Sequence, residues 1–460
     1  MRAEEEASRC NGAAHDSLGC IEARIPEDIL QLIFQAGVRQ FPHPAAFPSA
    51  TPPLEIALSH VNRRWRAAAL RLAELWSRVT ASPFEPPEKL DVYLQRSCGH
   101  ALGVCLFLMR DFWSAELLTR IRPCLGRIAR LHLVTDFVAP DSLVSAHFRA
   151  FDMPQLRTFL FTPLDTEFNP AAGGGKPLLS LAGGSPLLSS VRLNGPVLNL
   201  LRLPLSGITQ LCLVEERFPL PFRSICEILQ QCLSLVKFAF IGHSQRPHRR
   251  LAAPIDVLPF RLPELRYLAL SNGGNADVIL SAMTATKLDT IRLCNFDEGD
   301  LAYFLQLPPA SRFPVLASMT LLDNTFSIAD YHDIARLFPA VRAFACSNSL
   351  YTDDALEFLV PLPNSESATH MPWPNLDTLS FSEAQFQEKH QAMLCSLVAA
   401  RIALSAPIRR LFLGSANRVL LDGERLEWLK ERLVIDESPE MPEGEEMKSL
   451  VHFSGDVNLC

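Results

Sequence analysis

The feature that most constrains this chain is a triple of apolar residues at positions i, i+3 and i+5, which recurs eleven times between residues 128 and 413. Successive triples begin 20 to 35 residues apart, about 28 on average. Because 48% of the chain is apolar, the triple alone would often arise by chance, so its context decides its meaning. The triples are Ile128-Leu131-Leu133, Leu156-Phe159-Phe161, Leu188-Val191-Leu193, Ile208-Leu211-Leu213, Leu235-Phe238-Phe240, Leu265-Leu268-Leu270, Leu288-Ile291-Leu293, Leu316-Met319-Leu321, Val341-Phe344-Cys346, Leu376-Leu379-Phe381 and Ile408-Leu411-Leu413.

The context of these triples indicates a strand followed by a helix. Prolines, which cannot continue a helix, stand one or two residues before seven of the triples, at Pro154, Pro186, Pro263, Pro314, Pro339, Pro374 and Pro407. Between triples, residues 222–232 and 327–338 have helical apolar spacing, and Asp330 is placed to form a capping box with Ser327. One such unit cannot bury its own apolar edge, so the units are expected to stack.

This strand–helix repeat resembles leucine-rich repeats. The resemblance implies a curved solenoid with a ladder of parallel strands, over residues 125–435. The regular family pattern has Asn or Cys three residues after the last apolar residue of the triple. Asn324 fits that position, whereas Asn272, Asn295 and Asn348 lie one residue early, so the repeats are degenerate. An unrelated α/β packing is the alternative.

The segment from residue 25 to residue 79 carries three motifs in order. Residues 25–34 read Ile-Pro-Glu-Asp-Ile-Leu-Gln-Leu-Ile-Phe, in which the proline suits a first helical turn and the apolar residues recur at i,i+4 spacing. A second helix is predicted over residues 58–69, which contain Val-Asn-Arg-Arg-Trp-Arg. A third helical element is predicted at residues 75–79, which begin with Leu-Trp. Three such helices would enclose a small core around the two tryptophans.

These three motifs resemble an F-box, particularly the F-box-like domains of fungal proteins. Asn62 stands where the family often has Cys, and the proline-rich segment 41–53 lengthens the first connection. The resemblance implies docking onto a Skp-type adaptor and, through it, onto a cullin–RING ubiquitin ligase, with the residues of the first motif partly exposed in the free protein. The adaptor-binding residues implied are Ile25, Pro26, Ile29, Leu30, Ile33, Phe34, Val61, Trp65, Leu75 and Trp76. A three-helix packing module without an adaptor is the alternative, and core packing is the alternative for Trp65.

We therefore expect an α/β fold, in which a three-helix F-box-like module precedes a leucine-rich-repeat solenoid. The predicted organisation is a flexible tail at 1–22, the F-box-like domain at 23–80, a connecting first layer at 81–124, the solenoid at 125–435 and an acidic tail at 436–460.

The overall charge bears on the kind of partner to expect, although as an average it leaves a local basic patch possible, and the cysteine pattern bears on the compartment. The net charge of −7 does not favour nucleic acid or an anionic membrane surface. The chain lacks the roughly 18 consecutive apolar residues of a membrane-spanning helix, and its N-terminus lacks the features of a secretory signal. The twelve cysteines are scattered with no C-x-x-C pair, which favours a reducing cytoplasmic or nuclear compartment.

The sequence offers no convincing catalytic motif, cofactor site or metal site. Gly173-Gly174-Gly175-Lys176 is followed by proline where a phosphate-binding loop needs Ser or Thr. The basic cluster at residues 243–250 is compatible with an acidic peptide or with a solvated loop. In a curved solenoid, the residues between the buried anchors would line the concave side. The candidate substrate-binding residues there are Arg192, Arg292, Tyr267, His132 and Arg410.

The sequence thus predicts the substrate-recognition subunit of a ubiquitin ligase complex, which is not itself an enzyme and acts by bringing a protein substrate close to the transferring enzyme. A protein-interaction scaffold that does not promote ubiquitination is the first alternative. A hydrolase within the solenoid is the second, and the missing nucleophile motifs argue against it.

Overall fold

The computed structural model describes the chain in seventeen segments. They are residues 25–40, 52–82, 85–108, 114–135, 152–164, 179–181, 184–195, 201–215, 222–242, 259–271, 276–297, 300–305, 312–347, 352–360, 371–381, 388–413 and 423–436. The two predicted tails (apart from Asp436), most of the proline-rich segment, the Gly173–Lys176 motif and the basic cluster at 243–250 lie outside these residues.

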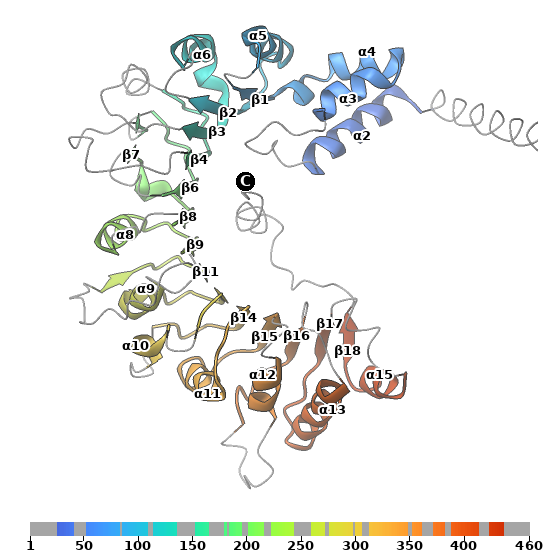
Figure 1. Cartoon of the computed structure of the whole chain (residues 1–460), viewed down its shortest axis with the longest axis vertical. Coiled ribbons are helices and arrows are strands. Elements are labelled where there is room, and N and C mark those ends of the chain that lie inside the picture. Colours follow the sequence, from blue (N-terminus) through green and yellow to red (C-terminus); the bar gives the residue numbers. More distant parts are fainter. Residues whose placement is uncertain are drawn as a thin grey trace, which may run out of the picture.

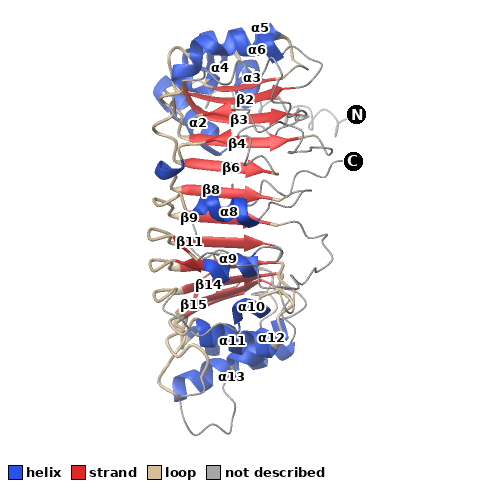
Figure 2. Cartoon of the chain, turned by 90° about the vertical axis from the view of Figure 1, so that its left-hand side faces the viewer, coloured by secondary structure: helices blue, strands red, loops and turns tan. Residues whose placement is uncertain are grey.

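Fourteen of the described strands form one sheet, in which strands follow one another in chain order and all pairs are parallel. Figure 1 shows the sheet as the inner lining of an arc, with the helices on the outer side. Seen from the outer side in Figure 2, the strands cross the molecule as successive parallel rungs. The strands of the sheet are β1 (Arg78–Ala81), β2 (Leu102–Leu108), β3 (Ile128–Thr135), β4 (Thr158–Pro163), β6 (Ser190–Asn194), β8 (Gln210–Val214), β9 (Lys237–Ile241), β11 (Tyr267–Ser271), β13 (Thr290–Cys294), β14 (Ser318–Leu322), β15 (Ala343–Ser347), β16 (Thr378–Phe381), β17 (Arg410–Leu413) and β18 (Val434–Asp436). The predicted α/β solenoid with a parallel ladder is confirmed.

Helices connect most of these strands across the outer side. Two short parallel pairs, β5 (Leu179–Ser180) with β7 (Leu201–Arg202) and β10 (Phe260–Arg261) with β12 (Met283–Thr284), lie outside the main sheet. The outer helices are α5 (Pro87–Arg96), α6 (Ser114–Ile121), α8 (Phe222–Leu229), α9 (Ala276–Ala282), α10 (Ala302–Leu305), α11 (Ile328–Leu337), α12 (Thr352–Leu359), α13 (Glu388–Ala403) and α15 (Gly423–Lys430), with short 3-10 helices η2 (Arg122–Arg127) and η5 (Leu205–Gly207). The predicted capping box is present: Asp330 N donates to Ser327 Oγ, and Ser327 N donates to Asp330 Oδ2.

The register of the ladder aligns the predicted triples position by position. The middle residue of each triple is the partner of the middle residue of the next, for example Phe238 with Leu268 and Leu268 with Ile291. All eleven triples are therefore successive strands of one ladder, which begins earlier, at β1 and β2, and ends later, at β18. The aligned anchors belong to one continuous apolar core that runs from the N-terminal helices to the last coil.

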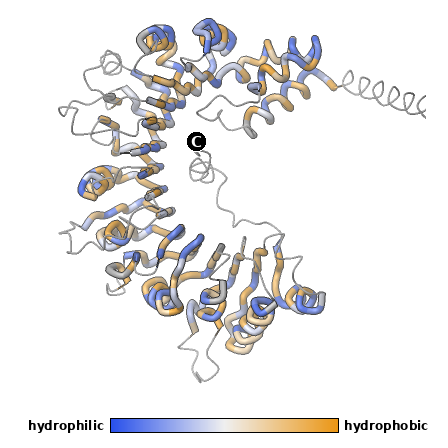
Figure 3. Tube along the Cα trace, viewed as in Figure 1, coloured by the Kyte–Doolittle hydropathy of each residue, from blue (hydrophilic) through white to orange (hydrophobic). Residues whose placement is uncertain are grey.

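Successive residues of each strand point to opposite faces of the sheet, so every coil contributes side chains both to the core and to the concave face. Figure 3 shows hydrophobic and hydrophilic residues interleaved along strands and helices rather than gathered in one part of the chain. In β9 the phenylalanines Phe238 and Phe240 enter the core, while Ala239 belongs to a separate apolar cluster on the opposite face of the sheet. A strand that alternates in this way has one face against the outer helices and one face on the concave side.

One buried asparagine joins two coils through both of its amide atoms. The side chain of Asn324 is 2% exposed, and its Nδ2 donates to the carbonyl oxygen of Leu293 at 3.0 Å. The backbone N–H of Phe296 donates to Asn324 Oδ1 at 2.8 Å. Asn324 is the residue that fits the regular family pattern. Asn295, one position early, instead ends its strand with a positive φ of 55°, a conformation that asparagine tolerates.

We predict that Asn324→Leu lowers the free energy of unfolding by about 2–4 kcal/mol, because two buried backbone groups of the preceding coil lose their partners. Chemical denaturation measures this directly. Ser318→Ala, at a half-buried outward position of β14, is the control and should change stability by less than about 0.5 kcal/mol. Equal effects from the two substitutions would contradict this role for Asn324.

The N-terminal segment contains three helices, but two predicted details are wrong. They are α2 (Glu27–Gln40), α3 (Leu54–Val61) and α4 (Arg63–Arg71). The single helix predicted over residues 58–69 is broken at Asn62, whose extended backbone ends α3 and whose side chain accepts the N–H of Trp65 at 2.8 Å to cap α4. The element predicted at residues 75–79 is a 3-10 helix, η1 (Ala73–Trp76), followed by strand β1. Pairing with β2 fixes that strand, and local sequence does not show this pairing.

Candidate interaction surfaces

The three N-terminal helices pack around an aromatic pair. Phe34 of α2 is 1% exposed, and its ring centroid lies 5.2 Å from that of Trp65 in α4. Leu30, one turn earlier on α2, is also buried. On α4, Ala68 and Ala69 are fully buried, and their short side chains allow α4 to pack closely against neighbouring elements. The inward face of α2 is thus the stripe that contains Leu30, Phe34 and Val38.

The outward face of α2 is apolar too. Ile29 and Ile33, one turn apart, are 43% and 47% exposed, and Leu32 beside them is also exposed. Val61, the last residue of α3, is about half exposed. Covering such side chains with a partner removes apolar area from water, at roughly 25 cal/mol per Å². These residues form a candidate binding surface, which we call the helical surface and define as Pro26, Ile29, Leu32, Ile33 and Val61.

The ten residues predicted to bind an adaptor divide by burial into three groups. Pro26, Ile29, Ile33 and Val61 are exposed, and Ile25 and Trp65 are partly buried. Four others are buried in the core: Leu30, Phe34, Leu75 and Trp76. The expected partial exposure of Leu30 and Phe34 is therefore not observed, because these residues face Trp65 and the core of the module. The adaptor-binding role of the remaining residues stays a prediction, and sequence reasoning missed the exposed Leu32.

Trp76 connects the helical module to the first coil of the solenoid. Its indole N–H donates to the carbonyl oxygen of Ala69 at 2.9 Å, and its ring meets the ring of Tyr93 in α5 edge-on at 5.2 Å. The Arg96 guanidinium lies 4.3 Å from the centroid of the tryptophan ring. The Tyr93 hydroxyl donates to Glu55 Oε1 in α3 at 2.6 Å, and burial, followed by the charge of Glu55, raises the pKa of Tyr93. These contacts hold the module in one orientation on the ladder.

We predict that Trp76→Ala lowers the free energy of unfolding by about 3–5 kcal/mol, because it leaves a large cavity between the module and the first coil. The comparison variant is Trp428→Ala, which removes a partly buried ring at the far end of the solenoid and should cost much less. Chemical denaturation, with limited proteolysis to locate the loosened region, measures the difference. Equal losses would contradict the special role of Trp76 in connecting the helical module to the first coil.

The predicted concave residues lie in two rows of outward strand residues, and the register fixes both rows. His132, Arg192 and Arg292 lie in one row, and Tyr267 and Arg410 lie in the neighbouring row. At about 4.8 Å per strand, Arg192 and Arg292 are about 19 Å apart along the ladder, and His132 and Arg410 about 48 Å. The five predicted substrate-binding residues therefore share one face but do not form one compact site, and their role in binding remains a prediction.

Several of these residues are held by neighbours on the same face. Arg192 is buried, and its Nε donates to Asn194 Oδ1 at 3.3 Å. His132 Nε2 lies 3.0 Å from Thr162 Oγ1, and its Nδ1 lies 3.6 Å from the thiol of Cys105. Burial raises the pKa of the Cys105 thiol to about 12, which favours the protonated thiol at neutral pH.

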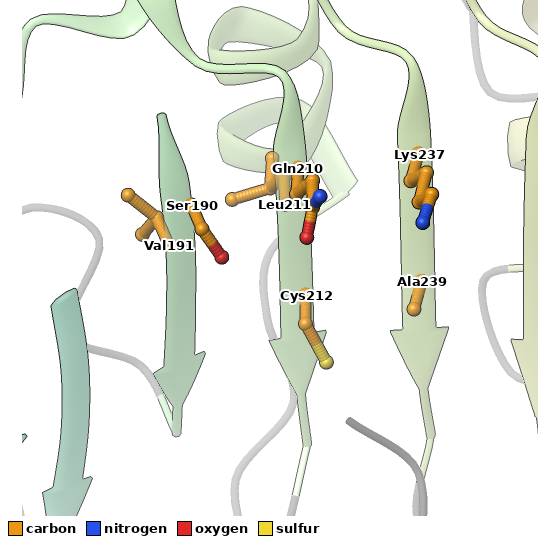
Figure 4. A pocket seen from close by; sticks show the side chains of 7 residues that line it. All are labelled: Ser190, Val191, Gln210, Leu211, Cys212, Lys237 and Ala239. Atoms are coloured by element: carbon orange, nitrogen blue, oxygen red, sulfur yellow. The ribbon is translucent and has the colours of Figure 1, made fainter. Parts of the chain in front are cut away.

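A second apolar cluster lies on the concave face at the centre of the ladder. It contains Tyr267 and partners from β8, β9 and β11: Cys212, Val214, Ala239, Ala269 and Ile241. Figure 4 shows residues that line a shallow depression there: Ser190, Gln210 and Lys237 lie on three neighbouring strands, with Cys212 further along the strand of Gln210 and Ala239 further along the strand of Lys237. The depression encloses about 190 Å³ even when space open to solvent is counted. Sites for small molecules typically enclose about 300–1,000 Å³, so this surface suits a protein better than a small ligand.

The described segments contain no candidate metal site and no helix suited to span a membrane. In these segments, no group of three or more His, Cys, Asp or Glu side chains is placed to hold a metal ion. Of the helices described, none combines the length and apolar character needed to cross a bilayer.

Comparisons with known proteins give a partial structural likeness. No protein-family model matches the chain, and no curated protein matches it. The structure of TLR13 in complex with ssRNA13 is similar at a TM-score of 0.39 and 14% identity, over 70% of this chain and 39% of that chain. An internalin, inlF, from Listeria monocytogenes is similar at a TM-score of 0.28 and 13% identity, over 84% of this chain and 94% of that one. The chain spans about two fifths of the TLR13 chain. The assignment as a leucine-rich-repeat type of solenoid rests on the strand ladder described above.

Proposed function

We propose that this chain is the substrate-recognition subunit of a Skp-adaptor/cullin/F-box-type E3 ubiquitin ligase. In this proposal the helical surface binds the adaptor, and the concave face of the solenoid binds a protein substrate. The chain contributes proximity rather than a catalytic group, since holding two proteins together raises the effective concentration of one near the other.

The observation that carries the proposal is the exposed apolar face of α2. Ile29 and Ile33 remain in water although the same helix buries Leu30 and Phe34 on its other side. An apolar patch left uncovered is a typical site of protein association. The motif order that resembles an F-box begins on this helix. The contacts of Trp76 with Ala69 and Tyr93 support the proposal further, because they hold the apolar face of α2 in a fixed position relative to the solenoid.

We predict that Ile29→Asp combined with Ile33→Asp weakens binding of a recombinant Skp-type adaptor by about 100-fold or more, as expected when two central apolar contacts become charged. Isothermal titration calorimetry or quantitative pull-down measures this loss. Leu30 is kept, because an aspartate at a 1% exposed position would disrupt the core. The matched control is Leu233→Asp with Val315→Asp, two exposed apolar residues of the solenoid.

Two outcomes would overturn parts of this proposal. Equal adaptor binding by the wild type and the Ile29/Ile33 variant, or no binding by either, removes the F-box assignment. Adaptor binding without any adaptor-dependent ubiquitination of proteins captured by the solenoid leaves the alternative, a non-catalytic scaffold. A reconstituted ubiquitination reaction, with the helical-surface variant as its negative control, makes that distinction.

A further inference from the structure

The concave face is cationic although the whole chain carries a net charge of −7. Along the two outward rows, from β1 to β17, the formally charged residues of the described strands are all basic. Only Asp436, in the last strand, is acidic. The basic residues of these rows are Arg78, Arg130, Arg192, Lys237, Arg292 and Arg410. The strands that carry them line the inside of the arc in Figure 1.

The register holds these like charges on one surface. Arg78 and Arg130 are separated by β2 alone, which places them about 10 Å apart along the ladder. The pKa of Arg78 is lowered mainly by burial and next by the charge of Arg130. Side chains of one sign gathered on a concave surface create a positive potential that attracts anions and repels other cations.

The apolar cluster interrupts this cationic face at its centre. Its residues lie on β8, β9 and β11, which are flanked by Arg192 on β6 and by Arg292 on β13. Lys237 stands in the neighbouring row on β9, at the edge of the depression in Figure 4. Cys212, Ala239 and Ala269 have short side chains, and the basic residues Arg192, Lys237 and Arg292 lie on the strands of this cluster or on the strands directly beside it. A complementary partner would place an apolar group on this cluster and negative charges near the basic residues on both sides of it.

We propose that this part of the concave face binds an acidic peptide segment of a protein, with one apolar side chain over β8–β11 and carboxylates on both sides of it. A peptide that crosses the strands would span the 19 Å or so from Arg192 to Arg292 with about six residues in an extended conformation. Carboxylates about six residues apart, with an apolar residue between them, are therefore the preferred pattern. The inference rests on the proposed function only where it identifies the protein that contains the acidic peptide as a substrate.

The same face is poorly suited to a nucleic acid. Six basic residues over the twelve strand steps from Arg78 to Arg410 give about one cation per 10 Å, and the central stretch is apolar. Binding of single strands also uses exposed aromatic rings on which bases stack. The phenylalanine and tyrosine residues of the described strands that face outward, Phe107, Tyr267 and Phe412, are all buried. These features favour a peptide over an RNA strand.

The test uses the 460-residue chain and a fluorescently labelled peptide with two glutamates at each end, the inner pair six residues apart, and a central leucine. Fluorescence anisotropy at 50 mM NaCl should show binding. The affinity should fall about tenfold or more when glutamines replace the glutamates, and severalfold when serine replaces the leucine. Equal affinity for the glutamine peptide, or no binding of the glutamate peptide, would overturn the proposal. An oligo-U RNA that binds when the peptide does not would assign the face to nucleic acid instead.

Substitutions that reverse the charge of selected basic residues locate the binding surface. Lys237→Glu with Arg292→Glu should lower the affinity for the peptide by about tenfold or more. The same charge change on the outer side, Arg223→Glu with Arg261→Glu, should lower this affinity by less than twofold. If the reversed variant fails to fold by circular dichroism, Lys237→Gln with Arg292→Gln replaces it, with an expected loss of about threefold. Equal losses on the two sides would refute the concave assignment.

Failure of this inference is distinguishable from failure of the proposed function. The Lys237/Arg292 variant should still bind the adaptor, and the Ile29/Ile33 variant should still bind the acidic peptide. Adaptor binding without peptide binding refutes the inference alone. Peptide binding without adaptor binding refutes the ligase assignment and leaves the concave site standing.

Discussion

The structure depends on contact between equivalent apolar residues of successive coils. A single coil has too little interior to bury its own strand, so each anchor pair is covered by the pairs before and after it, as Phe238 and Phe240 are by Leu268 and Leu270. Stability therefore resides largely in the interfaces between neighbouring coils. The first strand, β1, has no earlier strand to cover it, and Trp76 with the helical module covers that end. The module thus serves the fold as well as the proposed docking.

The alternation that buries the anchors also separates residues that hold the fold from residues that can bind a partner. In β9, Phe238 faces the core while Lys237 and Ala239 face the concave side, and the adjacent strands repeat this arrangement. Side chains of the outward rows can therefore vary with little effect on the core. A cationic face on a chain of net negative charge is possible because the register, and not the average composition, determines which residues meet on the concave side.

The spacing of apolar residues and prolines was enough to predict the strand ladder, and capping chemistry was enough to predict the helix after Ser327. Features fixed by distant contacts were not predictable. Leu30 and Ile29 are both apolar, and the packing of α2 against α4 and η1 decides which side of α2 is buried. The sequence also suggested nothing unusual about Arg401. Its guanidinium is fully buried and donates to the carbonyl oxygens of Pro372 and Trp373 in the preceding coil, and burial lowers its pKa to about 10.

A rigid joint between the two candidate surfaces bears directly on how a proximity mechanism would work. The Tyr93–Glu55 hydrogen bond and the Trp76 contacts leave the helical surface and the concave face in a fixed relation. A flexible linker of similar length would spread a bound partner over a large volume and lower its effective concentration at any one point. A rigid joint concentrates the partner in one place. The same rigidity restricts which bound proteins could be acted on. An enzyme recruited to the helical surface would reach only the part of a bound protein that the arc presents toward that surface.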